Sequence, residues 1–165
     1  MWWYQPNKPP MEIGRVLFLA GAFATHSFVG YALVAGLTDA DPRIGLVFGL
    51  LPDADFLFPA DWAWPFVHRG ITHTPLFALA VVAGGYAVGR QRSTPIGRRV
   101  GLAVGLALGS HLAIDSLSPK GIDFLFPLRT SWSPGLPVHS PTATVVLWTA
   151  SLALLVWDAN EQRWM

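Results

Sequence analysis

The residues of this chain that could perform chemistry are histidines and aspartates with apolar neighbours. The clearest pair is His111 and Asp115. If the run around them is helical, a spacing of four residues puts both side chains on one helix face, about 5–6 Å apart at Cβ. Such a pair can bind one metal ion, or act as one ligand and its supporting partner. A hydrogen bond on the helix surface is the alternative, but an unpaired ionised aspartate is costly in an apolar segment.

A second set of candidate residues lies in the stretch 48–75 and combines carboxylates, imidazoles and a guanidinium. Its members are Asp53, Asp55, His68, Arg69 and His73. A turn at Gly70 could aim both histidines into one cavity, and the planar guanidinium of Arg69 suits a phosphate or a carboxylate. Aspartates that cap a turn, and a basic turn at the membrane interface, are the alternative interpretations.

His26 stands by itself in the first apolar run, where a histidine is more often a buried core residue than a ligand. The other polar clusters are expected at a similar depth, and this makes His26 a candidate ligand as well. His139, Asp61 and Asp123 fall in expected loops and are weaker candidates.

Mixed nitrogen and oxygen ligation favours zinc, with manganese or iron as alternatives, bound as one or two ions. The candidate ligands are His26, Asp53, Asp55, His68, His73, His111 and Asp115. The chain has no cysteine, which excludes thiolate ligands and disulfides. It also lacks the HExxH, GxSxG, Walker and GxGxxG motifs. Two metals would account for so many ligands better than one, and paired metals commonly serve hydrolysis.

The composition is that of a membrane protein. Hydrophobic residues make up 52% of the chain and charged residues only 13%, against about 25% charged in soluble domains. The mean hydropathy is +0.42. A net charge of +1 gives no case for a nucleic-acid partner, so the expected partner is the lipid bilayer. A length of 165 residues suits a single domain, 1–165.

The apolar runs predict an all-α integral membrane protein with about four transmembrane helices and one re-entrant or broken segment. The expected helices are Ile13–Leu37, Thr74–Gly89, Val100–Leu117 and Pro141–Trp157. Ile44–Leu51 is expected to be a short helix and Pro52–Pro65 irregular, because Pro52 removes a backbone donor. Residues 1–12, with their tryptophans and prolines, are expected to form an interfacial lead-in. Residues 118–140 are expected to form a long loop.

The segment Arg90–Arg99 contains four arginines, and such clusters favour the cytoplasmic side. If the broken segment re-enters the membrane and returns, the N-terminus and this arginine loop both lie in the cytoplasm. That topology predicts a multi-pass protein of the plasma (inner) membrane, with the candidate site towards the outer face.

With these residues in view, the chain resembles the membrane-bound metal-dependent hydrolases of the YdjM type, first noted as LexA-regulated inner-membrane proteins. The resemblance covers roughly Thr25–Pro127. It rests on Thr25-His26, GLLPDAD at 49–55, HRGITHT at 68–74 and HLAIDSLSPKGIDFLFP at 111–127. It implies a multi-helix inner-membrane protein with a hydrolase site at the seven candidate ligands. The chain departs from the family pattern at Thr74, where serine is usual, and at Lys120, where an aromatic residue is expected.

A looser similarity to zinc-dependent phospholipase C covers only the order of the ligands, and it suggests a phosphoester of a lipid or other amphiphile as substrate. In such a hydrolase the metal would activate a water molecule. Arg69 would stabilise the developing negative charge, and Asp53 or Asp55 would relay a proton. The alternatives are a non-enzymatic membrane protein that binds or transports a metal, and a purely structural polar network. Few spans and the lack of an inverted repeat count against transport.

Overall fold

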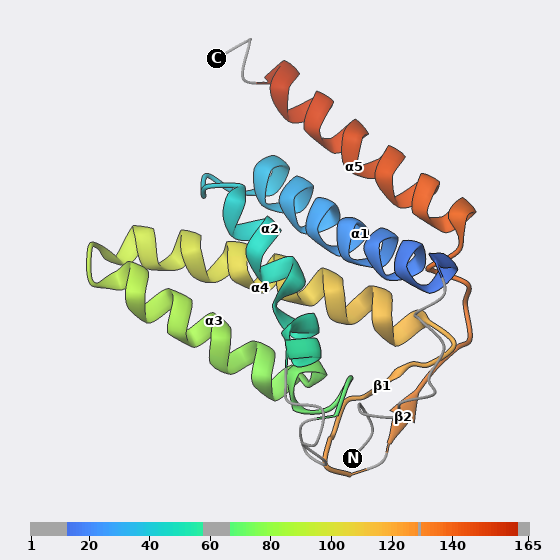
Figure 1. Ribbon diagram of the computed structural model, residues 1–165. Helices are drawn as coiled ribbons and strands as arrows, with labels where there is room; N and C mark the ends of the chain where they lie inside the picture. Colours follow the sequence, from blue (N-terminus) through green and yellow to red (C-terminus); the bar gives the residue numbers. More distant parts are fainter. Residues whose placement is uncertain (1–12, 58–66, 129, 162–165) are drawn as a thin grey trace.

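The computed structural model describes residues 13–57, 67–128 and 130–161, and this part of the chain is mostly helical. Its elements are α1 (Ile13–Leu37), α2 (Arg43–Leu50), the 3₁₀ helices η1 (Leu51–Leu57) and η2 (Ile71–His73), α3 (Pro75–Arg90), α4 (Thr94–Leu117), the paired strands β1 (Ile122–Asp123) and β2 (Ser131–Trp132), and α5 (Pro141–Glu161) (Figure 1). The all-α membrane class is confirmed. The predicted interfacial lead-in, residues 1–12, lies outside the described residues.

The helix starts follow local capping chemistry. Thr74 caps α3, since its hydroxyl accepts a hydrogen bond from the Phe77 amide at 3.1 Å, and Pro75 occupies the first turn. Ser93 caps α4 in the same way through the Ile96 amide, at 3.3 Å. Helix α4 therefore begins at Thr94 and not at the predicted Val100, and Pro95 lies in its first turn, where the missing amide costs little.

The segment after α2 is also more regular than predicted. Residues 51–57 form η1 where irregular backbone was expected, so that prediction was wrong for the described part of Pro52–Pro65. The missing amide of Pro52 costs little because Pro52 lies at the start of a new helix, where amides have no intrahelical partner. Residues 58–65 lie outside the described residues.

Helix α4 forms the centre of the bundle. It packs against α1, α2 and α3, and its inward face is built from Ala103, Val104, Ala107 and Leu108, all nearly inaccessible. Figure 1 shows α3 and α4 side by side as a hairpin, with α5 along the other side of α1. Within the described residues, three helices are long and apolar enough to cross a membrane: α1, α4 and α5 as far as Asn160. Helix α3 is apolar but shorter.

Close backbone contact joins α1 to α2. A Cβ atom on Gly45 would collide with the carbonyl oxygen of Gly30, and one on Gly49 would lie 2.6 Å from the carbonyl oxygen of His26. Glycines at such positions let two helix backbones approach each other directly, as in many membrane proteins. This contact fixes η1, which follows α2 immediately, against the middle of α1.

The structure separates the start of α1 from the arginine loop. Arg15 lines a cavity together with Lys120 and Ser140, whereas Arg99 lies with Asp39 at the opposite end of the bundle (Figure 1). The start of α1 and the arginine loop thus lie at opposite ends of the bundle in the described residues, an arrangement that differs from the one the shared-side prediction assumed. The difference arises because α2 and η1 carry the chain across from the arginine-loop end towards the site end and do not turn it back.

Candidate metal centre

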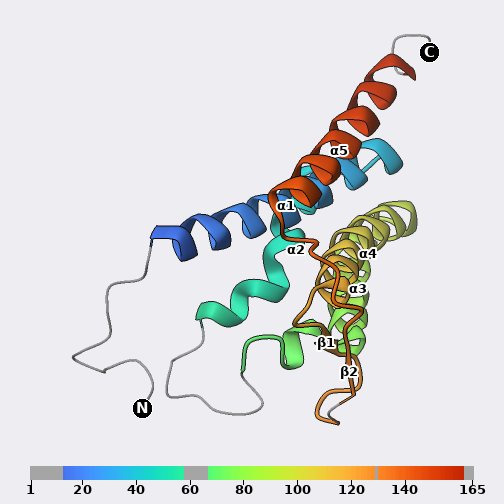
Figure 2. The ribbon, with the colours of Figure 1, turned by 90° about the vertical axis from the view of Figure 1, so that its right-hand side faces the viewer.

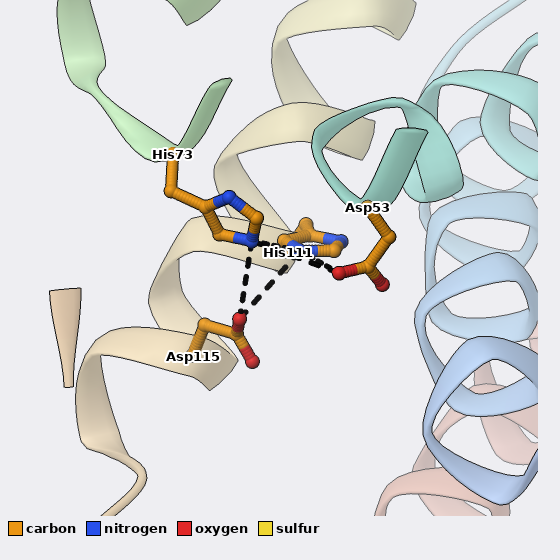
Figure 3. A group of neighbouring side chains, drawn as sticks. All are labelled: Asp53, His73, His111 and Asp115. Carbon is orange, nitrogen blue, oxygen red and sulfur yellow. Dashed lines mark hydrogen bonds and ion pairs between the residues drawn. The ribbon is translucent and has the colours of Figure 1, made fainter. Parts of the chain in front are cut away.

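Four of the predicted ligands converge at one point in the bundle. Their side chains come from three elements: Asp53 from η1, His73 from η2, and His111 and Asp115 from α4 (Figure 3). The spacing of four residues on α4 places the last two on one helix face, as predicted. The imidazoles of His73 and His111 are completely buried, Asp115 is 2% exposed, and the Asp53 side chain is 9% exposed.

The distances within this group suit a tetrahedral ion. Nε2 of His73 lies 3.2 Å from Nε2 of His111, 3.4 Å from Oδ2 of Asp115 and 3.7 Å from Oδ1 of Asp53. Nε2 of His111 lies 3.7 and 3.8 Å from the same two carboxylates. Ligand atoms about 2.0–2.1 Å from a tetrahedral zinc ion are about 3.4 Å apart. The group could therefore close around an ion with small side-chain movements.

The backbone of α2 orients the His111 ring. Nδ1 of His111 lies 2.7 Å from the carbonyl oxygen of Gly49, and because a carbonyl can only accept, Nδ1 must carry the proton. The lone pair then lies on Nε2, which faces the group. A metal-binding histidine usually donates its other N–H in this way.

The His73 ring is held through its other nitrogen as well. Its Nδ1 lies 3.1 Å from the Thr72 hydroxyl, and that hydroxyl donates to Asp55 at 3.1 Å. Nδ1 also lies 3.4 Å from Oδ2 of Asp55, so Nδ1 is the donor and Nε2 is free for a ligand. Burial alone would lower the pKa of His73. Hydrogen bonds with the surrounding carboxylates, Asp115 first, outweigh burial and raise the pKa, so this position favours a positive charge.

Asp55 lies beside the four-residue group and not in it. Its carboxylate accepts from Nδ1 of His68 and from the amide of Arg69, both at 3.0 Å. Burial raises the pKa of Asp55, but the hydrogen bonds from His68 and His73 outweigh burial and hold the pKa below its ordinary range. Asp55 is therefore an ionised anchor that orients two histidines.

His68 does not reach the four-residue group. It belongs to a separate cluster with Asp55 and His73, and its side chain is 29% exposed. The ring lines the cavity at the centre of the site. An imidazole held by a buried carboxylate and open to a cavity is suited to transfer protons.

Arg69 bridges the site to the loop after α4. Its Nη2 lies 2.9 Å from Oδ1 of Asp115, and its Nη1 donates to the Ser118 hydroxyl at 2.7 Å and to the Gly121 carbonyl at 2.9 Å. The residue has a φ of 65°, a strained conformation of a kind that is frequent at functional sites. The guanidinium is fixed in place and lines the central cavity.

His26 and His139 meet Asp115 at its second oxygen. Nε2 of His139 lies 3.2 Å from Oδ1 of Asp115, and Nε2 of His26 lies 3.5 Å from it. The His26 ring stacks on His111 with a centroid distance of 3.9 Å. Sequence reasoning treated His139 as a weak loop candidate. Its position directly before an apolar helix was the only signal for it.

Comparison with known proteins places the chain in a membrane-protein family. A family model described as YdjM inner membrane protein matches residues 21–165. The inner membrane protein YbcI of Escherichia coli (strain K12) is 33% identical over 113 residues, which is 62% of this chain. The match spans 65% of that relative's length. No solved structure gives a significant match.

Proposed function

The chain belongs to the YdjM inner membrane protein family, and we propose that it is a metal-dependent hydrolase that cleaves a phosphoester of a lipid or other amphiphile. The observation that carries this proposal is the convergence of two imidazole nitrogens and two carboxylates at tetrahedral spacing, deep in a bundle of membrane-length helices. Ionisable residues at such depth are costly and commonly mark functional sites.

The proposed metal is a single zinc ion held by Asp53, His73, His111 and Asp115. Two nitrogen and two oxygen donors suit zinc, and manganese or iron are the alternatives. A second ion between His26, Asp115 and His139 would have to bind Oδ1 of Asp115. It is disfavoured because the Arg69 guanidinium already lies 2.9 Å from that oxygen. One positive charge already occupies that position.

When bound, the ion would act as a Lewis acid that polarises a phosphoryl oxygen and lowers the pKa of a water molecule. Arg69 contributes a fixed positive charge in the lining of the central cavity. Asp115 and Ser118 hold the two terminal nitrogens of Arg69 in place. The guanidinium charge is therefore preorganised for the negative charge that develops on the phosphoryl oxygens.

The pair of Asp55 and His68 is proposed to move the proton. In hydrolysis the water oxygen bonds to phosphorus, the bond from phosphorus to the leaving oxygen breaks, and one water proton must reach that oxygen. His68 lines the cavity and can accept and return this proton, while Asp55 holds the ring and stabilises its charged form. Asp55 is thus a positioning residue, and Asp53 is a ligand.

The proposed orientation puts the arginine loop in the cytoplasm and the metal centre towards the outer face. Five arginines lie at the arginine-loop end of the bundle: Arg43, Arg90, Arg92, Arg98 and Arg99. Three basic residues lie at the site end in the described residues, and all three line one cavity. The positive-inside tendency favours this arrangement.

A phosphodiester assay on purified, zinc-loaded protein tests the proposal. Bis(p-nitrophenyl) phosphate and a short-chain phospholipid serve as probes. We expect turnover that is lost on chelation and restored by zinc, and that falls about 10²–10⁴-fold in His68→Ala while bound zinc is retained. Zinc-loaded protein that hydrolyses neither probe would contradict the proposal. Uptake of zinc into proteoliposomes in the same preparation would favour transport.

A further inference from the structure

We propose that the substrate is an anionic phospholipid, with its head group in a cationic cavity beside the metal centre and an acyl chain in an apolar groove between α1 and η1. The proposal rests on the proposed function only in calling this lipid the substrate. The metal centre itself requires neither of these two binding sites.

The head-group site is a cavity of about 600 Å³ next to the metal centre. Its basic lining residues are Arg15 on α1, Arg69 before η2, and Lys120 in the loop after α4. Among the described residues, no carboxylate lines it. Arg69 is paired with Asp115, so Arg15 and Lys120 supply positive charge in excess. Such a cavity selects an anion.

The described residues that line this cavity carry positive charges and no negative charge. The pKa of Lys120 is lowered first by burial and then by the positive charge of Arg69. Asp55, Asp115 and Asp53 each act in the opposite direction, and each of them less strongly than Arg69. The Ser140 side chain and the His139 ring complete a polar wall that can donate to phosphate oxygens.

The chain site is a groove of about 340 Å³ with apolar walls. Phe23 of α1 lines one wall, and Val47 and Leu50 of α2 with Phe56 and Leu57 of η1 line the other. Val47 is 61% and Leu57 85% exposed, so the groove opens to the surface through apolar side chains. In Figure 2 the N-terminal half of α1 and η1 both lie on the side of the molecule away from the α3–α4 hairpin. On a membrane-embedded bundle, lipid is what such a surface meets.

Both sites adjoin the metal centre, and this continuity is what selects a lipid as the occupant. Asp53 lines both the groove and the small central cavity, while Arg69 and His68 line the central cavity and the cationic one. Phe56 borders all three. A lipid with an apolar tail, an anionic phosphodiester and no cation in its head group would place its phosphorus between the two sites. A free phosphate would use only the cationic cavity.

Lipid binding to zinc-loaded and chelated protein in detergent tests the proposal by native mass spectrometry. The probes are phosphatidylglycerol, phosphatidylcholine and inorganic phosphate. We expect preferential binding of phosphatidylglycerol in both metal states, reduced about tenfold in the double variant Arg15→Ala/Lys120→Ala. The matched control is Arg92→Ala/Arg99→Ala, which removes two charges at the other end of the bundle and should bind as wild type does. Equal binding of the two lipids, or equal loss in both double variants, would overturn the head-group site.

The groove is tested by filling it. Val47→Trp should weaken long-chain phosphatidylglycerol about tenfold and leave a two-carbon-chain analogue unaffected. Val146→Trp on α5 is the control, since Val146 is also 61% exposed and lies outside the groove. Binding of inorganic phosphate alone, with no lipid preference, would contradict the lipid proposal. Lipid binding by protein that takes up no zinc even when zinc is supplied would leave both sites standing and refute the proposed hydrolase, so the two failures are distinguishable.

Discussion

Nε2 of His73 and Nε2 of His111 face each other at 3.2 Å, and the other nitrogen of each ring is already a donor elsewhere. Two lone pairs at this distance repel each other unless a cation lies between them. The two aspartates beside them, Asp53 and Asp115, add negative charge at the same point. A metal ion at this point would be held by all four groups together.

Loss of a single ligand should therefore empty the site. We expect about one zinc per chain in wild-type protein and almost none in His111→Ala, because three ligands without His111 bind far more weakly. Elemental analysis of the purified proteins measures this. His68→Ala is the matched control and should keep its zinc, since His68 lies outside the four-residue group. Near-zero metal in wild type and His111→Ala alike would contradict the metal centre.

Loss of a supporting carboxylate should weaken the site without emptying it. Asp55 orients His73 through its contacts with Nδ1 and with the Thr72 hydroxyl. Asp55→Asn should lower zinc affinity about 10–100-fold, the range usual for partners of metal ligands. Competition with a chelator of known affinity gives the value. Asp41→Asn is the control, because it alters an exposed carboxylate that is paired with Arg43. Its zinc affinity should equal that of the wild type.

The candidate ligands were predictable because their chemistry conflicts with their surroundings. His111 and Asp115 lie in an apolar run, and their spacing of four residues, about one helical turn, places them on the same helix face. Asp53 and His73 were recognisable from type and motif. Which of the seven candidates meet at one point was not predictable, since the division between Asp53 and Asp55 depends on the 3₁₀ geometry of η1.

The contribution of His139 and the path of the chain were harder to predict for a similar reason. His139 reaches Asp115 only because the loop after α4 returns to the site before α5 begins. The side of Arg15 depended on whether α2 and η1 turn back, and the glycine contact that settles their path involves residues distant in sequence. Long-range packing of this kind leaves no local pattern.

The separation of Arg15 from the arginine loop can be measured by cysteine labelling, because the chain has no cysteine of its own. Single cysteine variants report on the start of α1 (Arg15→Cys), the loop before α5 (Leu136→Cys) and the arginine loop (Arg92→Cys). We expect an impermeant maleimide to label the first two from the outer side and the third only in inverted vesicles. Labelling of Arg15→Cys and Arg92→Cys from the same side would instead restore the shared-side topology.

The contact of α1 with α2 should be the most sensitive packing position outside the site. Gly45→Ala places a methyl group against the Gly30 carbonyl, and the two helices must separate. Overpacking of this kind costs about 1–3 kcal/mol, so the thermal midpoint in detergent should fall by several degrees. Gly84→Ala on α3 is the control, because nothing lies within 4 Å of its added methyl and its helix should gain slightly. The separation should also move Gly49, whose carbonyl holds His111, and Gly45→Ala should therefore bind zinc more weakly than Gly84→Ala. A Gly45→Ala protein with unchanged midpoint and zinc affinity would show that the α1–α2 contact does not position the metal centre.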